Sequence, residues 1–160
     1  GDHRDLHAFP TRRASDLGRA PGIAGFYRER LAAPARVEEG AGGRAVQVGV
    51  GERQELIFRE SEAPLAAYDG HHLQVYIADF AGPHARLQAR GLVSEESDQH
   101  QYRFQEIVEL SSGRPLFTIE HEVRSMRHPM YARPLVNRNP AQSNRNYRQG
   151  RDAFVWSEPH

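Results

Sequence analysis

Cysteine is absent from this sequence of 160 residues, and its absence excludes several kinds of protein at once. Disulfide-bonded scaffolds, cysteine nucleophiles, thiolate zinc sites and iron–sulfur clusters all need this residue. Long hydrophobic runs are also missing: no stretch approaches the roughly 18 consecutive apolar residues of a membrane span, and the first residues lack the apolar centre of a signal peptide. We therefore expect a cytoplasmic protein that makes no contact with a membrane.

Lysine is missing as well, so all 21 basic residues are arginine, and they balance 21 acidic residues to a net charge of zero. This neutrality argues against a dedicated nucleic-acid-binding protein, which normally carries a clear positive excess. Each arginine can form planar, two-pronged contacts with carboxylates or phosphates. Hydrophobic residues make up 38% of the chain, which is enough for one domain or for two small modules that share a core.

Residues 5–17 have the sequence DLHAFPTRRASDL, which shows no helical or strand period and is interrupted by Pro10. The segment resembles the translation of sequencing-adapter DNA, and the alternative is a disordered native N-terminus. On either interpretation, residues 1–17 contribute nothing to the predicted fold.

The first predicted module covers residues 18–62 and consists of a helix followed by three strands. Residues 22–33 place apolar side chains at helical spacing, and Pro34 limits the helix. Alternating apolar residues and glycine-rich turns then predict antiparallel strands over residues 35–39, 44–50 and 54–60.

A linker over residues 63–70 leads to the second predicted module, residues 71–124. Its pattern predicts a strand, a helix and three further strands, over residues 72–79, 82–90, 92–93, 101–110 and 115–124. This is the order βαβββ, and the first module would match it if one more strand preceded its helix. We therefore predict an α+β fold of paired βαβββ modules, in which the first strand of module one is missing.

Three stretches carry a resemblance to a known family: GFYRERLAAPARV, GERQELIF and HLQVYIADFAGPHARLQARG. They resemble the first helix with its following strand, the last strand of a module, and the start of the second module in the vicinal oxygen chelate superfamily. This superfamily includes glyoxalase I, extradiol dioxygenases and bleomycin-resistance proteins. The resemblance extends over residues 20–124, and the segment EHEVRSMRHPMYARPLVNRNP suggests a bacterial subgroup.

The resemblance implies a cleft between the modules, in which a divalent metal (Fe, Mn, Ni or Zn) acts as a Lewis acid on a small oxygen-rich molecule. Family members hold the metal with residues from the first and last strands of each module. His72 matches the first-strand ligand of module two, and Glu55 matches the last-strand ligand of module one. The matching place in module two is Phe117, which cannot bind a metal. Glu120 lies on the opposite face of that strand and is the third candidate ligand if the strand register shifts. The implied chemistry is that of a lyase, an isomerase or a dioxygenase.

Each candidate ligand also has an ordinary structural interpretation. His72 could be a hydrogen-bonded residue at the start of a strand, and Glu55 could be one arm of an ion pair. On a strand, Glu120 and Glu122 share one face and His121 takes the other, so these three cannot converge on one ion.

Three residues at the predicted last two strands are candidates for contact with a substrate: His100, Tyr102 and Arg124. His100 and Tyr102 share a face with Phe104, and this aromatic stripe could line the cleft or pack in the core. Arg124 could bind a substrate or pair with the neighbouring glutamates.

Residues 125–160 are predicted to form an extended arm. Residues 123–151 contain seven arginines and no acidic residue, and three prolines forbid a long helix. The arm could wrap the domain, clamp an anion, bind RNA or mediate self-association into a homodimer. The expected partner is a small molecule, and metal-independent binding or sequestration, as in bleomycin-resistance proteins, is the alternative to catalysis.

Overall fold

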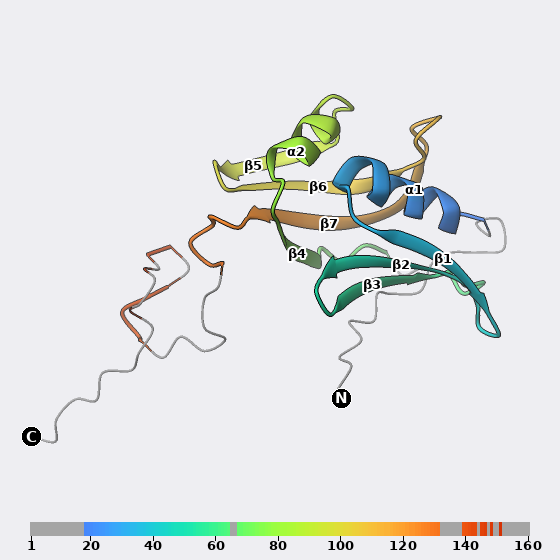
Figure 1. Ribbon diagram of the computed structural model, residues 1–160, viewed down its shortest axis with the longest axis horizontal. Coiled ribbons are helices and arrows are strands. Elements are labelled where there is room, and N and C mark those ends of the chain that lie inside the picture. The colour runs from blue at the N-terminus through green and yellow to red at the C-terminus, as the bar shows by residue number, and fades with distance from the viewer. Residues whose placement is uncertain are drawn as a thin grey trace, which may run out of the picture.

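The structure of the protein is a computed structural model that describes residues 18–64, 67–131, 139–143, 145, 146, 148 and 151 (Figure 1). The adapter-like segment 1–17 and most of the predicted arm at 125–160 lie outside these residues. Within the described part of the chain, no helix is long and apolar enough to cross a membrane.

Module one begins with α1 (Ala20–Leu31), whose first turn contains a proline. The backbone N–H groups of Gly18 and Ala20 both donate to Oε1 of Glu60, at 2.9 Å, so this carboxylate satisfies donors that the helix leaves free at its start. Three antiparallel strands follow in the order β1-β2-β3. Their bounds are Ala35–Gly40 for β1, Gly43–Gly51 for β2 and Gln54–Arg59 for β3.

Module two has the complete order βαβββ. Its elements are β4 (His72–Ile77), α2 (Ala81–Gln88), β5 (Val93–Asp98), β6 (Gln101–Val108) and β7 (Pro115–Ser125). The strands form one sheet in the order β4-β7-β6-β5, with β4 parallel to β7 and the other neighbours antiparallel. The predicted α+β class and the βαβββ arrangement of module two are therefore confirmed.

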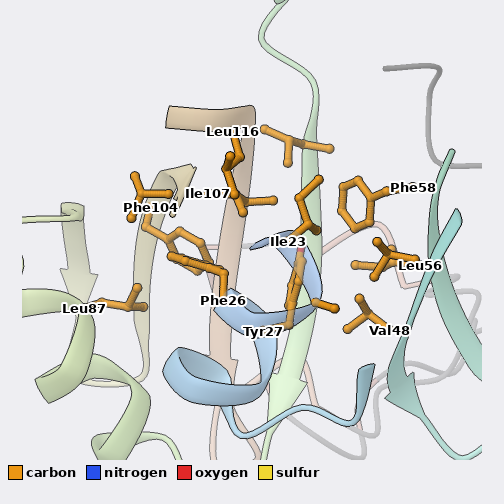
Figure 2. Close-up of a cluster of buried hydrophobic side chains, with 14 of the residues drawn as sticks. Ile23, Phe26, Tyr27, Val48, Leu56, Phe58, Leu87, Phe104, Ile107 and Leu116 are labelled. Atoms are coloured by element: carbon orange, nitrogen blue, oxygen red, sulfur yellow. The ribbon is translucent and has the colours of Figure 1, made fainter. Parts of the chain in front are cut away.

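Helix α1 joins the two modules through a shared core. It contacts β1 and β2 of its own module and also β6, β7 and α2 of the other. Figure 2 shows its apolar face between side chains of both sheets. The ring of Tyr27 lies 5.7 Å from that of Phe58 on β3, and the ring of Phe26 lies 5.9 Å from that of Phe104 on β6. Burial of these large aromatic side chains is a major source of stability for the fold.

Strand β7 separates its side chains cleanly between two faces. Ile119, His121 and Val123 are buried on the side of the core, so Glu120 and Glu122 lie on the opposite side, as alternation along a strand requires. The sequence predicted this separation of His121 from its two acidic neighbours.

His121 is held as a neutral ring inside the core. The carbonyl of Ile119 lies 2.8 Å from its Nδ1 and can only accept, so Nδ1 carries the proton. Nε2 then accepts a hydrogen bond from the Tyr27 hydroxyl at 2.6 Å, and the ring stacks on Phe104 at 4.2 Å. Burial lowers the pKa of His121 to about 4 and raises that of the Tyr27 hydroxyl, so both groups are uncharged at neutral pH.

Candidate ligand-binding face

The side of the four-stranded sheet that faces away from the core carries a continuous group of polar side chains, which we call the polar face. Strand register fixes its membership: His72 lies opposite Glu120, Arg103 opposite Glu122, and Tyr76 opposite Arg124. Its members are His72, Gln74 and Tyr76 on β4; Gln101, Arg103 and Gln105 on β6; and Glu120, Glu122 and Arg124 on β7.

Arg103 bridges the two glutamates of β7. Its Nη1 donates to Oε1 of Glu120 at 2.8 Å, and its Nη2 donates to Oε2 of Glu122 at 2.7 Å. The other oxygen of Glu120 accepts from the Gln105 amide at 3.1 Å. A third carboxylate, that of Glu95 on β5, lies 4.0 Å from Nε of Arg103. Among the described residues, Nε itself has no hydrogen-bond acceptor.

Arg124 holds the other end of the polar face. Its Nη2 forms an ion pair with Oε1 of Glu122, and its Nε donates to the Gln101 side chain at 2.7 Å. Its Nη1 lies 3.2 Å from the Tyr76 hydroxyl and 3.5 Å from the sulfur of Met130. The guanidinium also lies 5.9 Å from the centre of the Tyr76 ring, within range of a cation–π contact.

Burial differs strongly across these charged groups. The Glu122 side chain is 4% exposed and that of Arg124 is 11% exposed, whereas Glu120 is 16%, Arg103 27% and His72 46% exposed. A charge as buried as that of Glu122 is stable only when it is paired, and here two guanidinium groups pair with it. The polar face is thus a charge-balanced network that is closed at Glu122 and open to solvent beside His72.

An aromatic group borders the Arg124 end of the polar face. The ring of Tyr131 lies 5.3 Å from that of Tyr76, and the ring of His128 lies 6.3 Å from it. Both come from the segment directly after β7. Burial and the nearby charge of Arg124 lower the pKa of His128, which favours its neutral form.

The structure brings some of the predicted site residues together. His72, Glu120 and Arg124 all belong to the polar face, and Nε2 of His72 lies 3.9 Å from Oε2 of Glu122. Glu55, in contrast, lies on β3 in the other sheet, where it accepts from Arg36 at 3.4 Å.

The two other predicted contact residues lie away from the polar face. Tyr102 alternates with Arg103 and is buried beneath α2, with its ring 5.0 Å from both Phe80 and His84. His100 lies just before β6, and its Nδ1 is 3.3 Å from the Ser125 hydroxyl. Of the predicted aromatic stripe, Tyr102 and Phe104 therefore pack on the side of the core.

Sequence reasoning did not select Arg103, Glu122 or Gln101 as site residues. Once Glu120 is assigned to the polar face, alternation along β7 also assigns Glu122 to it. The same rule applied to β6 gives the series 101, 103 and 105, opposite the Tyr102 series. The signal was present, but the prediction followed the Tyr102 series on β6 and did not consider the opposite one.

The residues of the polar face include the right chemical types for a divalent metal, since imidazole and carboxylate oxygens are common ligands. However, the guanidinium of Arg103 already bridges Glu120 and Glu122, and Arg124 takes the remaining oxygen of Glu122. Within the described ranges, no group of three His, Asp or Glu side chains is placed to hold a metal ion. With Arg103 in this position, the arrangement does not fit the predicted metal.

Comparison with known proteins finds no matching family model and no matching curated sequence. Several solved structures have a similar course of the chain. Glyoxalase I of Leishmania major, described as trypanothione-dependent, is 18% identical, with 78% of this chain and 87% of that chain covered and a TM-score of 0.49. The fosfomycin resistance protein FosX of Listeria monocytogenes, in complex with Mn(II) and sulfate, is 12% identical, with 76% and 92% covered and a TM-score of 0.48.

A third similar structure is TnmS3, an antibiotic-binding protein from Streptomyces sp. CB03234. It is 16% identical, with 78% of this chain and 98% of that chain covered and a TM-score of 0.43. Glyoxalase I is a member of the superfamily that the sequence resembles. Likenesses as distant as these carry no information on a reaction or a ligand, which must be argued from the polar face itself.

Proposed function

We propose that this protein binds a small oxygen-rich molecule on the polar face and needs no metal to do so. The observation that supports the proposal is the pairing of Arg103 and Arg124 with the buried Glu122, beside the open side chain of His72. Buried charges cost free energy unless they are paired, and this paired network also reaches solvent beside His72, where its charged and polar groups can meet a ligand.

The network offers both donors and acceptors to a ligand. The Arg103 side chain is 27% exposed and uses one N–H group of each Nη for the two glutamates, so its other Nη N–H groups are the donors that it offers to a carboxylate or hydroxyl oxygen of a ligand. The carboxylate of Glu120 and the exposed ring of His72 can accept from or donate to a ligand hydroxyl. A hydroxy acid, which carries both kinds of group, matches this set better than a simple anion does.

Metal-dependent chemistry of the lyase, isomerase or dioxygenase type is the second candidate. It is favoured by the register that sets His72 directly opposite Glu120, and by the 3.9 Å between His72 and Glu122. It is opposed by Arg103, whose charge and hydrogen bonds occupy both carboxylates. A homodimer and a cytoplasmic location remain predictions from the sequence.

The proposal can be tested by thermal unfolding in the presence of EDTA, with tartrate, citrate and gluconate as hydroxy-acid probes. At least one probe should raise the Tm of the wild-type protein, and the variant Arg103→Gln should lose the effect. Arg114→Gln is the matched control, because Arg114 forms an exposed ion pair with Glu109 at the far end of the same sheet. No response to any probe, or an equal response in Arg103→Gln, would argue against the proposal.

A further inference from the structure

We infer that the guanidinium of Arg103 occupies the place at which His72, Glu120 and Glu122 would otherwise hold a divalent metal. Removing this guanidinium would therefore create a metal site. The inference rests on the polar face being the functional face of the proposed function, but not on which molecule binds there. It concerns the role of one residue that the resemblance to metal-binding proteins did not single out.

The geometry of the three surrounding side chains supports this role. Arg103 donates to one oxygen of Glu120 at 2.8 Å and to Oε2 of Glu122 at 2.7 Å. That same Oε2 lies 3.9 Å from Nε2 of His72. Two ligand atoms of one tetrahedral zinc ion lie about 3.3 Å apart, given metal–ligand distances near 2.0–2.1 Å. The donors of His72 and Glu122 are therefore close to the spacing that one ion requires, and the guanidinium of Arg103 holds Glu120 beside them. A metal would bind all three only after their side chains rotate, because as they stand they form no such group.

Charge leads to the same conclusion. The two glutamates alone would present two negative charges beside a neutral imidazole, which is a favourable set for Zn²⁺ or Mn²⁺. With Arg103 between them and Arg124 on the far side of Glu122, the charges of these two glutamates are already balanced. A divalent ion would have to displace one guanidinium and lie close to the other, and both effects oppose its binding.

A guanidinium in the place of a metal also acts on a bound ligand in a different way. A metal polarises a bound oxygen as a Lewis acid, whereas a guanidinium does so by donating hydrogen bonds through a fixed planar fork. Two of the five N–H groups of Arg103 are used by the glutamates, and the side chain is 27% exposed, so N–H groups on its Nη atoms remain for a ligand. Arg103 can thus hold the carboxylates in place and bind a ligand oxygen at the same time.

The test is a gain of metal binding by the full-length protein. We would make Arg103→Gln and Arg103→Met, dialyse them with the wild type against Zn²⁺ or Mn²⁺, and measure bound metal by mass spectrometry and the shift in Tm. Both variants should bind about one ion per chain and gain roughly 5–10 °C in Tm at saturating metal. The wild type should bind a small fraction of that amount and show no shift.

Two controls make the result specific. His72→Ala combined with Arg103→Gln should lose the gained metal. Arg36→Gln should gain none, because Arg36 also bridges two glutamates, Glu38 and Glu55, but is exposed and lies in the other sheet.

Metal bound by the wild type in a His72-dependent manner would overturn the inference. So would folded Arg103 variants that bind no metal, or variants that stay unfolded even when metal is present during refolding. A failure of the hydroxy-acid probes would leave the gain of metal binding unaffected, so the two proposals fail separately.

Discussion

The buried pair of Tyr27 and His121 predicts that the protein loses stability as the pH falls from 7 to 5. His121 is 1% exposed, its Nδ1 proton is donated to a backbone carbonyl, and its Nε2 accepts from the Tyr27 hydroxyl. Protonation would add a second proton to the ring, at Nε2. This would break the hydrogen bond that Nε2 accepts from Tyr27 and leave a positive charge in the core. The folded protein therefore resists protonation much more strongly than the unfolded chain does.

The sign and the size of the effect follow from the pKa of His121. Burial lowers this pKa from 6.5 to about 4 in the folded protein, so between these values the unfolded chain binds more protons. Stability is complete above pH 6.5 and declines as the pH falls toward 4. The free energy of unfolding should be about 2 kcal/mol lower at pH 5 than at pH 7 because of this group alone, and the loss should level off at about 3 kcal/mol.

The assay is urea unfolding at pH 7, 6 and 5 of the wild type and of His121→Gln. Glutamine cannot titrate, and its amide oxygen can still accept from Tyr27. The variant should therefore lose less stability over this pH range, by about 2 kcal/mol, whatever its stability at pH 7. His84→Gln is the control for changing a partly exposed histidine, because His84 is 26% exposed and pairs with Glu96, and this variant should not reduce the wild-type decline. If the wild type and His121→Gln lost the same free energy of unfolding between pH 7 and pH 5, the conclusion that His121 is buried in its neutral form would be refuted.

Three further predictions concern the core and the polar face. Glu60→Ala removes the carboxylate that accepts from two N–H groups at the start of α1 and should cost about 1 kcal/mol, whereas Glu52→Ala in an exposed turn should cost almost nothing, as measured by urea unfolding. Leu87→Ala removes a fully buried side chain of α2 and should cost about 2–5 kcal/mol in the same assay. Arg124→Gln leaves Glu122 partly unpaired and should cost about 3–5 kcal/mol; adding Glu122→Gln should recover part of this loss, and a simple sum of the single effects would contradict the coupling.

Much of the fold could be predicted because its strands alternate. The residues of β2, β3 and β7 that alternation assigns to the core are buried or, like Val50 and Phe117, partly buried against it, and glycine-containing turns separate the strands. Strand β5 was predicted as residues 92–93 only, although it extends over Val93–Asp98. Its sequence, VSEESD, has almost no apolar residue, because an edge strand with both faces near solvent needs none. Pairing with β6, which the sequence of β5 does not reveal, is what holds it.

The candidate site could be predicted only in part, because it depends on which strands become neighbours. The resemblance to a metal-binding family selected His72 and Glu120, and the parallel pairing of β4 with β7 indeed sets them opposite each other. Arg103 meets Glu122 through the antiparallel register of β6 and β7, which shifts by one residue between Phe104 and Glu106. Such an irregularity depends on packing across the whole sheet, so it cannot be predicted from the sequence of β6 or β7 alone.

The four charged side chains at the centre of the polar face balance one another, and this balance limits which ligands can bind there. On the polar face, the charges of Arg103 and Arg124 balance those of Glu120 and Glu122. A strong anion would have to compete with both carboxylates for the guanidinium groups, and a cation would have to displace the guanidinium groups from the carboxylates. A ligand that carries both donors and acceptors can instead add hydrogen bonds to the network without breaking its ion pairs. Binding of a singly charged hydroxy acid such as gluconate should for this reason depend less on salt than binding of a more highly charged anion with no hydroxyl groups, such as sulfate.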